Sequence, residues 1–258
     1  MYNVRITDQI SNKLSVYEAY LYYCLALCTD FNTMESNAKQ IAIARIYYEI
    51  PKDKENMSNS YLDNVRKYLH TLESFGFITI SKNKVKGKFG TFEKFKYNLS
   101  NEHFFMVSNK LYDEPIKKEL KGFLILLKSL TLNGTNLILY TLDDLEKELK
   151  YSRRQISTYI KELKELGYLK AEKKGISIIR DDLFPVLGSK VENYKNIIET
   201  LLSSPKFCIT KTMKQYLEAK KNNFKDIENK ESFFLYVITG VPYRSKKKKE
   251  KCEIIIMQ

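Results

Sequence analysis

The chain has few of the residues on which catalytic and metal sites depend. His70 and His103 are its only histidines, so it lacks the histidine pair of rolling-circle nucleases and has little material for a zinc site. Cys24 and Cys28 share one helical face, and we interpret them as small core residues. The sequence also lacks a Gly-x-x-x-x-Gly-Lys-Ser/Thr phosphate loop, which argues against ATPases and helicases. We therefore expect no enzymatic activity, no cofactor and no metal site.

Long apolar runs are missing as well. No run approaches the roughly 20 residues that would cross a bilayer, and Met1–Arg5 lacks the basic-then-apolar pattern of a signal peptide. The four cysteines are too few and too scattered for a disulfide framework. These absences favour a cytoplasmic chain that does not enter a membrane.

Acidic residues are outnumbered by basic ones. The 44 Lys and Arg stand against 31 Asp and Glu, which gives a net charge of +13 and a pI near 9.3. A field of this sign attracts polyanions, meaning nucleic acid or an anionic membrane surface. Charge alone does not choose between these partners.

The strongest organisational signal is an internal repeat, in which residues 65–78 match residues 156–169 without a gap. Apolar residues and one glycine recur 91 positions apart: Val65/Ile156, Tyr68/Tyr159, Leu69/Ile160, Leu72/Leu163, Phe75/Leu166, Gly76/Gly167, Phe77/Tyr168 and Ile78/Leu169. The apolar spacing i, i+3, i+4, i+7 predicts an amphipathic helix. The glycine suits a left-handed C-terminal cap, and the residues after it predict a strand.

Signals for helix starts precede and open the two copies. They lie at Ser15–Glu18, Asn37–Gln40, Thr141–Asp144 and Ser152–Gln155, of which the first and the last are typical capping boxes. Residues 137–140 predict a short strand. Strand pairs are expected at 77–99 and at 169–179, the latter with Lys174-Gly175 at its turn. Each half therefore predicts helix, short strand, helix, turn, helix, strand, strand.

This order resembles the winged-helix fold, a helix-turn-helix with a β-hairpin wing. Residues 151–169 look like the recognition helix and first wing strand of many bacterial members, whereas the first copy departs by a longer turn, Pro51–Asn59. The resemblance implies a mainly α chain with small β-hairpin wings (α+β). The expected divisions are winged-helix domain 1 at 1–100, a linker at 101–114, winged-helix domain 2 at 115–184, a helical region at 185–243, and a basic tail with an apolar terminus at 244–258.

In a helix-turn-helix, the second helix enters the major groove with its N-terminal residues at base edges. The resemblance therefore implies DNA contacts from Asn59, Ser60, Tyr61, Asn64, Arg66 and Lys67, and from Arg153, Arg154, Gln155, Ser157, Thr158 and Lys161. Arg suits guanine, whereas Asn and Gln suit adenine. Gln155 can instead be used by its own capping box. The alternative is an ordinary solvated helix face.

The wings are expected to touch the DNA backbone or minor groove. Their candidate contacts are Lys82, Lys84, Lys86 and Lys88 in the first wing and Lys173 and Lys174 in the second. In the first wing, alternating lysines, with Lys94 and Lys96 on the return strand, are expected to project much of their charge from one face. The alternative is that lysines only protect an edge strand from aggregation.

Two winged helices in one chain of this size resemble the replication initiators of plasmids and mobile elements, and phage replisome organisers are a second resemblance. The implied function is sequence-specific binding of double-stranded DNA, with host replication proteins as further partners and a homodimer left open. One alternative is a transcriptional regulator whose C-terminal helices serve dimerisation or ligand sensing. Another is an adaptor in which one winged helix binds protein. The run Arg244–Lys251 is either a further DNA contact or a solvated tail.

Overall fold

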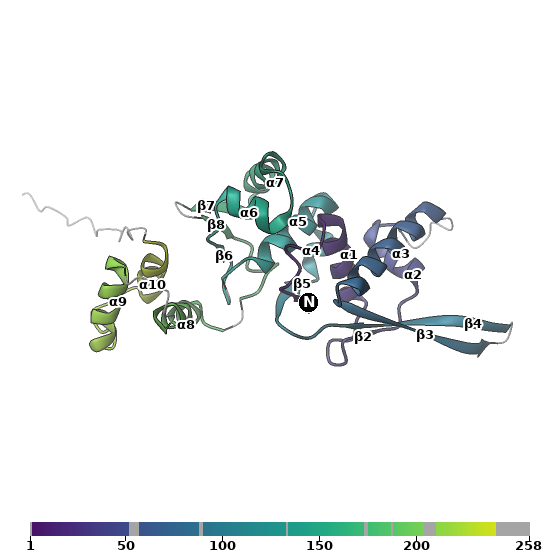
Figure 1. Cartoon of the computed structure of the whole chain (residues 1–258), viewed down its shortest axis with the longest axis horizontal. Helices are drawn as coiled ribbons and strands as arrows, with labels where there is room; N and C mark the ends of the chain where they lie inside the picture. Colours follow the sequence, from purple (N-terminus) through teal and green to yellow (C-terminus); the bar gives the residue numbers. More distant parts are fainter. Residues whose placement is uncertain are drawn as a thin grey trace, which may run out of the picture. The chain divides into compact units, whose positions relative to one another are not determined.

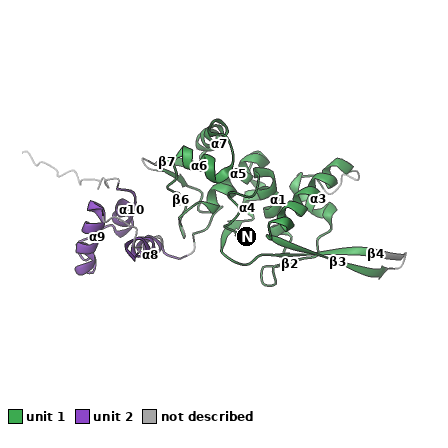
Figure 2. Ribbon diagram, in the orientation of Figure 1, with its two compact units in different colours: residues 1–187 green, residues 188–258 purple. Residues whose placement is uncertain are grey.

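The chain folds into two compact units, residues 1–187 (unit 1) and residues 188–258 (unit 2), shown in Figure 2. The computed structural model describes residues 2–51, 57–87, 90–132, 134–172, 175–186, 188–203 and 210–240 (Figure 1). Unit 1 combines helices with small antiparallel sheets, and the described part of unit 2 is helical. The expected mixture of helices and small sheets is confirmed.

Unit 1 contains the same architecture twice. The first half has helices α1 (Val16–Leu27), α2 (Gln40–Tyr47) and α3 (Asn59–Ser74), and strands β2 (Glu35–Ser36), β3 (Ile78–Gly87) and β4 (Gly90–Leu99). The second half has helices α5 (Lys118–Ser129), α6 (Leu142–Leu149) and α7 (Arg153–Glu165), and strands β6 (Leu137–Ile138), β7 (Leu169–Glu172) and β8 (Gly175–Ile178). The strand orders β2-β4-β3 and β6-β8-β7 correspond element by element.

The repeated helix–glycine–strand segment is confirmed in both halves. Val65 and Leu72 are buried in α3, and their repeat partners Ile156 and Leu163 are buried in α7. After each helix a glycine takes the left-handed conformation: Gly76 (φ +75°) after α3 and Gly167 (φ +78°) after α7. A side chain is strained in that conformation, so glycine lets each helix end sharply and lead directly into a strand.

Helix starts follow the predictions in part. The Ser15 hydroxyl and the Thr141 hydroxyl each accept the backbone N–H three residues on, and each returning carboxylate is in place. At Ser152 only half of the capping box forms, because the Gln155 amide donates to the Tyr159 hydroxyl instead of returning to the cap.

The predicted cap at Asn37 is wrong. Helix α2 begins at Gln40 after Lys39, which makes no side-chain cap hydrogen bond. The Ser36 hydroxyl accepts the N–H of Ala38 and donates to the Cys28 carbonyl, so residues 36–38 form a turn of their own before the helix.

The expected linker 101–114 is built into unit 1. It contains strand β5 (Phe104–Ser108), which pairs antiparallel with the N-terminal strand β1 (Asn3–Thr7), and the short helix α4 (Lys110–Asp113). Val4 lies opposite Val107 in this pair, and both side chains are buried. The segment between the two halves therefore contributes to the core.

The two halves of unit 1 pack through their equivalent first helices, α1 and α5. A Cβ added to Gly122 of α5 would lie 1.9 Å from the carbonyl oxygen of Val16 in α1. The Val16 N–H donates to the Tyr151 hydroxyl at 2.8 Å, and the Tyr17 hydroxyl donates to Glu119 at 3.1 Å. Glycine thus permits a backbone-to-helix contact that polar side chains then fix.

A buried lysine reinforces the same interface. Lys121 of α5 is 1 % exposed, and its ammonium donates to Glu49 at 2.8 Å and to the Tyr112 carbonyl at 2.6 Å. Glu49 follows α2 of the first half, and Tyr112 belongs to α4. One side chain therefore ties the second half to the first half and to the connecting segment, with its charge compensated as a buried charge requires.

Unit 2 consists of helices α8 (Lys190–Ser203), α9 (Lys211–Lys221) and α10 (Lys230–Thr239), as predicted. Its core is formed by Tyr194, Ile198, Met213, Tyr216, Phe234 and Val237. Helix α10 is apolar nearly all round, and Leu235, Tyr236 and Ile238 are only partly buried.

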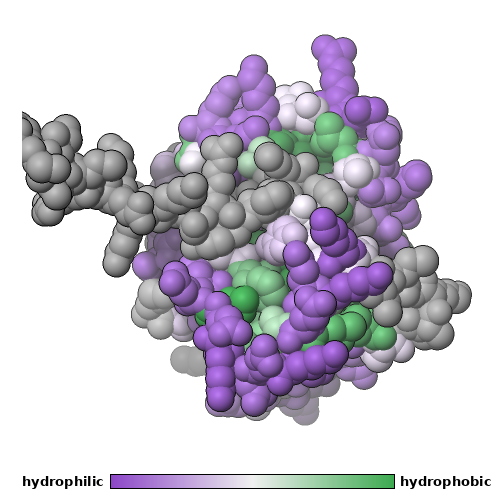
Figure 3. Space-filling view, turned by 90° about the vertical axis from the view of Figure 1, so that its left-hand side faces the viewer, coloured by the Kyte–Doolittle hydropathy of each residue, from purple (hydrophilic) through white to green (hydrophobic). Residues whose placement is uncertain are grey.

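Figure 3 shows one face of the molecule, on which hydrophobic patches appear between hydrophilic side chains. Within the described residues, no helix combines the length and apolarity that a membrane crossing needs.

The close approach at Gly122 gives a direct stability test. Gly122→Ala should lower the free energy of unfolding of unit 1 by about 1–3 kcal/mol or more, because the new methyl group meets backbone that cannot move independently. Gly167→Ala is the matched control, since its Cβ meets open space and only the left-handed backbone costs about 1 kcal/mol. Urea denaturation measures both, and a smaller loss for Gly122→Ala than for the control would contradict the crossing.

Candidate nucleic-acid interface

Helix α7 presents a polar and basic surface to solvent. The Ser152 hydroxyl caps the helix, and burial of Ile156 and Leu163 fixes which side faces the core. The predicted residues on the other side are all exposed: Arg153, Arg154, Gln155, Ser157, Thr158 and Lys161. All six predicted residues therefore lie on the solvent-exposed side of α7.

The two arginines of α7 differ in their surroundings. The Arg153 guanidinium pairs with Asp143 of α6 at 2.8 Å, and its backbone N–H donates to Glu146 at 3.1 Å. The Arg154 guanidinium has no hydrogen-bond or ion-pair partner among the described residues, and only its carbonyl is used, by Thr158. Arg154 is thus ready to bind an outside acceptor, whereas Arg153 must first leave an exposed pair worth about 0–1 kcal/mol.

Helix α3 presents the corresponding surface in the first half. The predicted residues are again all exposed: Asn59, Ser60, Tyr61, Asn64, Arg66 and Lys67. Three of them already form side-chain hydrogen bonds within the protein, Ser60 with the Ser58 hydroxyl at 2.7 Å. The Arg66 side chain binds Asp63 at 3.0 Å and Gln40 at 3.1 Å, and the Asn64 amide donates to the Tyr48 hydroxyl at 3.3 Å.

An aromatic pair lies at the start of α3. The rings of Tyr48 and Tyr61 stack with their centroids 4.0 Å apart and their planes 15° apart. The ammonium of Lys118, at the start of α5, lies 4.5 Å from the Tyr48 centroid. Tyr61 is one of the contacts predicted from the sequence, but its stacking partner Tyr48 directly follows α2, and Lys118 of α5 contacts Tyr48. No local sequence pattern connects these three residues.

Strands β3 and β4 form a long hairpin that extends beyond the helices of the first half (Figure 1). Each strand has 10 residues, so at about 3.3 Å per residue the hairpin is roughly 33 Å long. Lys82, Lys84 and Lys86 are exposed on it, whereas Lys88 lies outside the described residues.

The hairpin lysines do not share one face. Lys82 pairs across the strands with Phe95 and Lys84 with Glu93, whereas Lys94 pairs with Asn83. Residues opposite each other point to the same side, so the even-numbered lysines of β3 lie on one face and Lys94 and Lys96 on the other. Lys96 is moreover paired with Glu35 at 2.6 Å. The lysines of β3 thus project from one face, as expected for much of the charge, whereas the two lysines of β4 lie on the opposite face.

The second hairpin is shorter. Strands β7 and β8 pair Glu172 with Gly175, and the predicted contacts Lys173 and Lys174 lie outside the described residues. A Cβ at Gly175 would lie 2.1 Å from the carbonyl oxygen of Ile138 in β6. Glycine is required there because the hairpin comes so close to the third strand.

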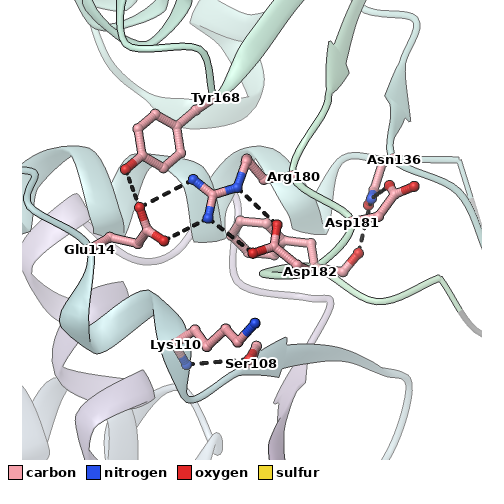
Figure 4. A network of polar contacts seen from close by, with 9 residues as sticks. Ser108, Lys110, Glu114, Asn136, Tyr168, Arg180, Asp181 and Asp182 are labelled. Carbon is pink, nitrogen blue, oxygen red and sulfur yellow. Dashed lines mark hydrogen bonds and ion pairs between the residues drawn. The ribbon is translucent and has the colours of Figure 1, made fainter. Parts of the chain in front are cut away.

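A charged cluster that the sequence did not reveal anchors the end of this hairpin (Figure 4). The Arg180 guanidinium binds Glu114 at 2.6 Å and Asp182 at 2.8 Å, and the Tyr168 hydroxyl donates to the same Glu114. Burial favours the neutral form of Glu114, but the hydrogen bonds from Arg180 and Tyr168 hold its pKa below its usual range. The cluster joins Arg180 to Glu114, 66 positions earlier in the chain, and its charged groups are paired with one another within the protein.

A second buried cation serves the core of the second half. Lys128 is 4 % exposed, and its ammonium donates to the Thr135 carbonyl at 2.7 Å and to the Asn136 side chain at 2.6 Å. Asn136 in turn donates to Asp181. Burial lowers the pKa of Lys128 to about 8. The side chain holds the loop before β6 and is not available to a ligand.

No metal centre is found in the part of the chain that the structure describes. No group of three or more His, Cys, Asp or Glu is arranged there to hold an ion. Cys24 is buried in α1 and Cys28 is partly buried at its end.

The chain was also compared with known proteins. No family model, no curated protein and no solved structure gives a significant match.

The different surroundings of the two arginines lead to a test. Arg154→Ala should weaken binding to a preferred duplex, selected from a random pool, by about 5- to 150-fold, the range of one bidentate base contact. Arg153→Ala should cost less, because its guanidinium is shared with Asp143. Fluorescence anisotropy measures both affinities. An equal loss for the two variants would contradict the expected difference between the arginines, and no loss for Arg154→Ala would exclude this helix from the proposed DNA contact.

Proposed function

We propose that the chain binds double-stranded DNA through two winged-helix modules, formed by the two halves of unit 1. The observation that carries the proposal is the duplicated architecture, three helices and three strands with the strand orders β2-β4-β3 and β6-β8-β7. In proteins of this kind the third helix lies in the major groove and the hairpin contacts the neighbouring groove or backbone. Helices α3 and α7 and the hairpin β3–β4 have these roles in the proposal.

The charges on these elements support a polyanionic partner. Arg154 and Lys67 are exposed on the third helices, and Lys84 and Lys86 are exposed on the hairpin. None of these four has an acidic partner within 4 Å among the described residues, whereas the buried lysines Lys121 and Lys128 are engaged inside the protein. An α-helix, about 10–12 Å wide, matches a major groove about 12 Å wide. Both the sign of the charge and the shape of the elements therefore favour duplex DNA.

Among DNA-binding proteins, a replication initiator of a plasmid, phage or other mobile element is the role we propose. Its support is the combination of two modules in one compact unit with a separate helical unit in the same chain. In this proposal unit 1 binds the origin, and the partly exposed apolar side chains of α10 leave unit 2 available to host replication proteins.

The hairpin provides the experiment. Replacing Lys82, Lys84 and Lys86 with Gln should reduce the slope of log affinity against log salt by about 2–3, because each phosphate contact contributes about 0.9. Replacing three exposed lysines of unit 2, Lys214, Lys221 and Lys225, makes the same change in net charge and should leave the slope nearly unchanged. Titrations of duplex DNA at several salt concentrations measure both slopes. An unaltered slope in the hairpin variant would contradict DNA contact by these lysines and favour the alternative that they protect an edge strand from aggregation.

A further inference from the structure

Helix α3 begins one turn earlier than its counterpart in the second half. The repeat places Arg153, the first residue of α7, opposite Leu62, because the separation is 91 positions. Helix α3 already starts at Asn59. The turn Asn59–Tyr61 therefore has no helical equivalent in α7, and it is an addition specific to the first half.

This additional turn carries an aromatic ring on a fixed support. Tyr61 stacks on Tyr48 at 4.0 Å, and the Asn64 amide holds the Tyr48 hydroxyl at 3.3 Å. Since Tyr61 covers one face of Tyr48, the Lys118 ammonium at 4.5 Å lies over the other. A cation over a ring face is attracted to it. Tyr48 is thus held between Lys118 and Tyr61, and it supports one face of the Tyr61 ring.

The outermost ring is accessible. Tyr61 is 39 % exposed, whereas Tyr20 and Tyr47 deeper in the same aromatic cluster are 0 % and 1 % exposed. A ring that served only the core would be covered like these two. Tyr61 instead keeps an orientation set by its partners while offering surface to the outside, so a flat ligand meets it at little cost in conformational entropy.

The expected position of α3 determines which ligand fits. An aromatic ring in the groove of a regular duplex meets the edges of base pairs, because the base faces are covered by stacking. A nucleobase that has left the stack offers a face, and stacking on an aromatic side chain is the usual way proteins hold such bases. We propose that Tyr61 is a stacking platform for an unstacked nucleobase next to the duplex bound by α3. The proposal rests on the proposed DNA binding and adds the form of DNA that the first half prefers.

The test compares two DNA probes with the full chain. One is a fully paired duplex, and the other is the same duplex with a central unpaired 2-aminopurine. The chain should bind the second probe about 5- to 150-fold more tightly, the range expected for one stacked base, and should quench 2-aminopurine fluorescence.

The variants separate stacking from other roles of the side chain. Tyr61→Phe should keep the preference and the quenching, whereas Tyr61→Ala and Tyr61→Leu should lose both while still binding paired duplex. Phe31→Ala removes another exposed aromatic residue, 42 % exposed in the loop between α1 and β2, and should behave like the unchanged chain. Circular dichroism checks that α3 persists in each variant.

Several outcomes would overturn the inference. If Tyr61→Ala weakens binding to both probes equally, the ring contacts a groove feature such as a thymine methyl group, and the inference fails while the proposed function stands. Loss of the preference in Tyr61→Phe would assign it to the hydroxyl. A Tyr61-dependent preference without binding to paired duplex would retain the platform and refute the two-module proposal, and no binding to either probe would refute both.

Discussion

Helix α5 approaches the backbone of helix α1 so closely at Gly122 that a single methyl group would fall 1.9 Å from the Val16 carbonyl oxygen. The two halves of unit 1 meet at this contact, and its neighbours are polar groups with specific partners. Val16 donates to Tyr151, and the buried ammonium of Lys121 is shared between Glu49 and Tyr112. Interfaces of this kind adopt one arrangement and resist small displacements, because both the close packing and the buried charge penalise any gap.

The same contact lies beside both third helices. The ring centroid of Tyr159 in α7 lies 4.9 Å from that of Phe123 in α5. The ring centroid of Tyr68 in α3 lies 6.0 Å from that of Tyr47, which in turn contacts Tyr20 of α1. Tyr68 and Tyr159 are repeat partners, 91 positions apart, that approach the interface from opposite halves. A chain in which α3 and α7 both bind DNA would thus present them from one compact unit, while the extra first turn and the long hairpin make the first half different from the second.

Sequence patterns predicted the elements that depend on residues close together in the chain. The apolar stripe through Val65 and Leu72 and the glycines that follow both repeats determine the third helices, their C-terminal caps and the strands after them, and these were found as expected. The N-terminal cap predicted at Asn37 was not. The pairing of β1 with β5 depends on residues about 100 positions apart, and neither five-residue strand carries enough pattern to reveal its partner. The Arg180–Glu114 pair and the Tyr48–Tyr61 stack are likewise products of the tertiary fold. The site residues were predicted as surface positions, but their partners, which decide which of them are free to bind, could not be.

Hydrogen–deuterium exchange of the full chain, with and without duplex DNA, tests most directly whether unit 1 binds DNA with both halves. If both halves bind, exchange slows in the first turns of α3 and α7 and along the β3–β4 hairpin, with little change in α8, α9 and α10. Protection that is confined to unit 2, or to only one of the two third helices, would contradict binding by both halves.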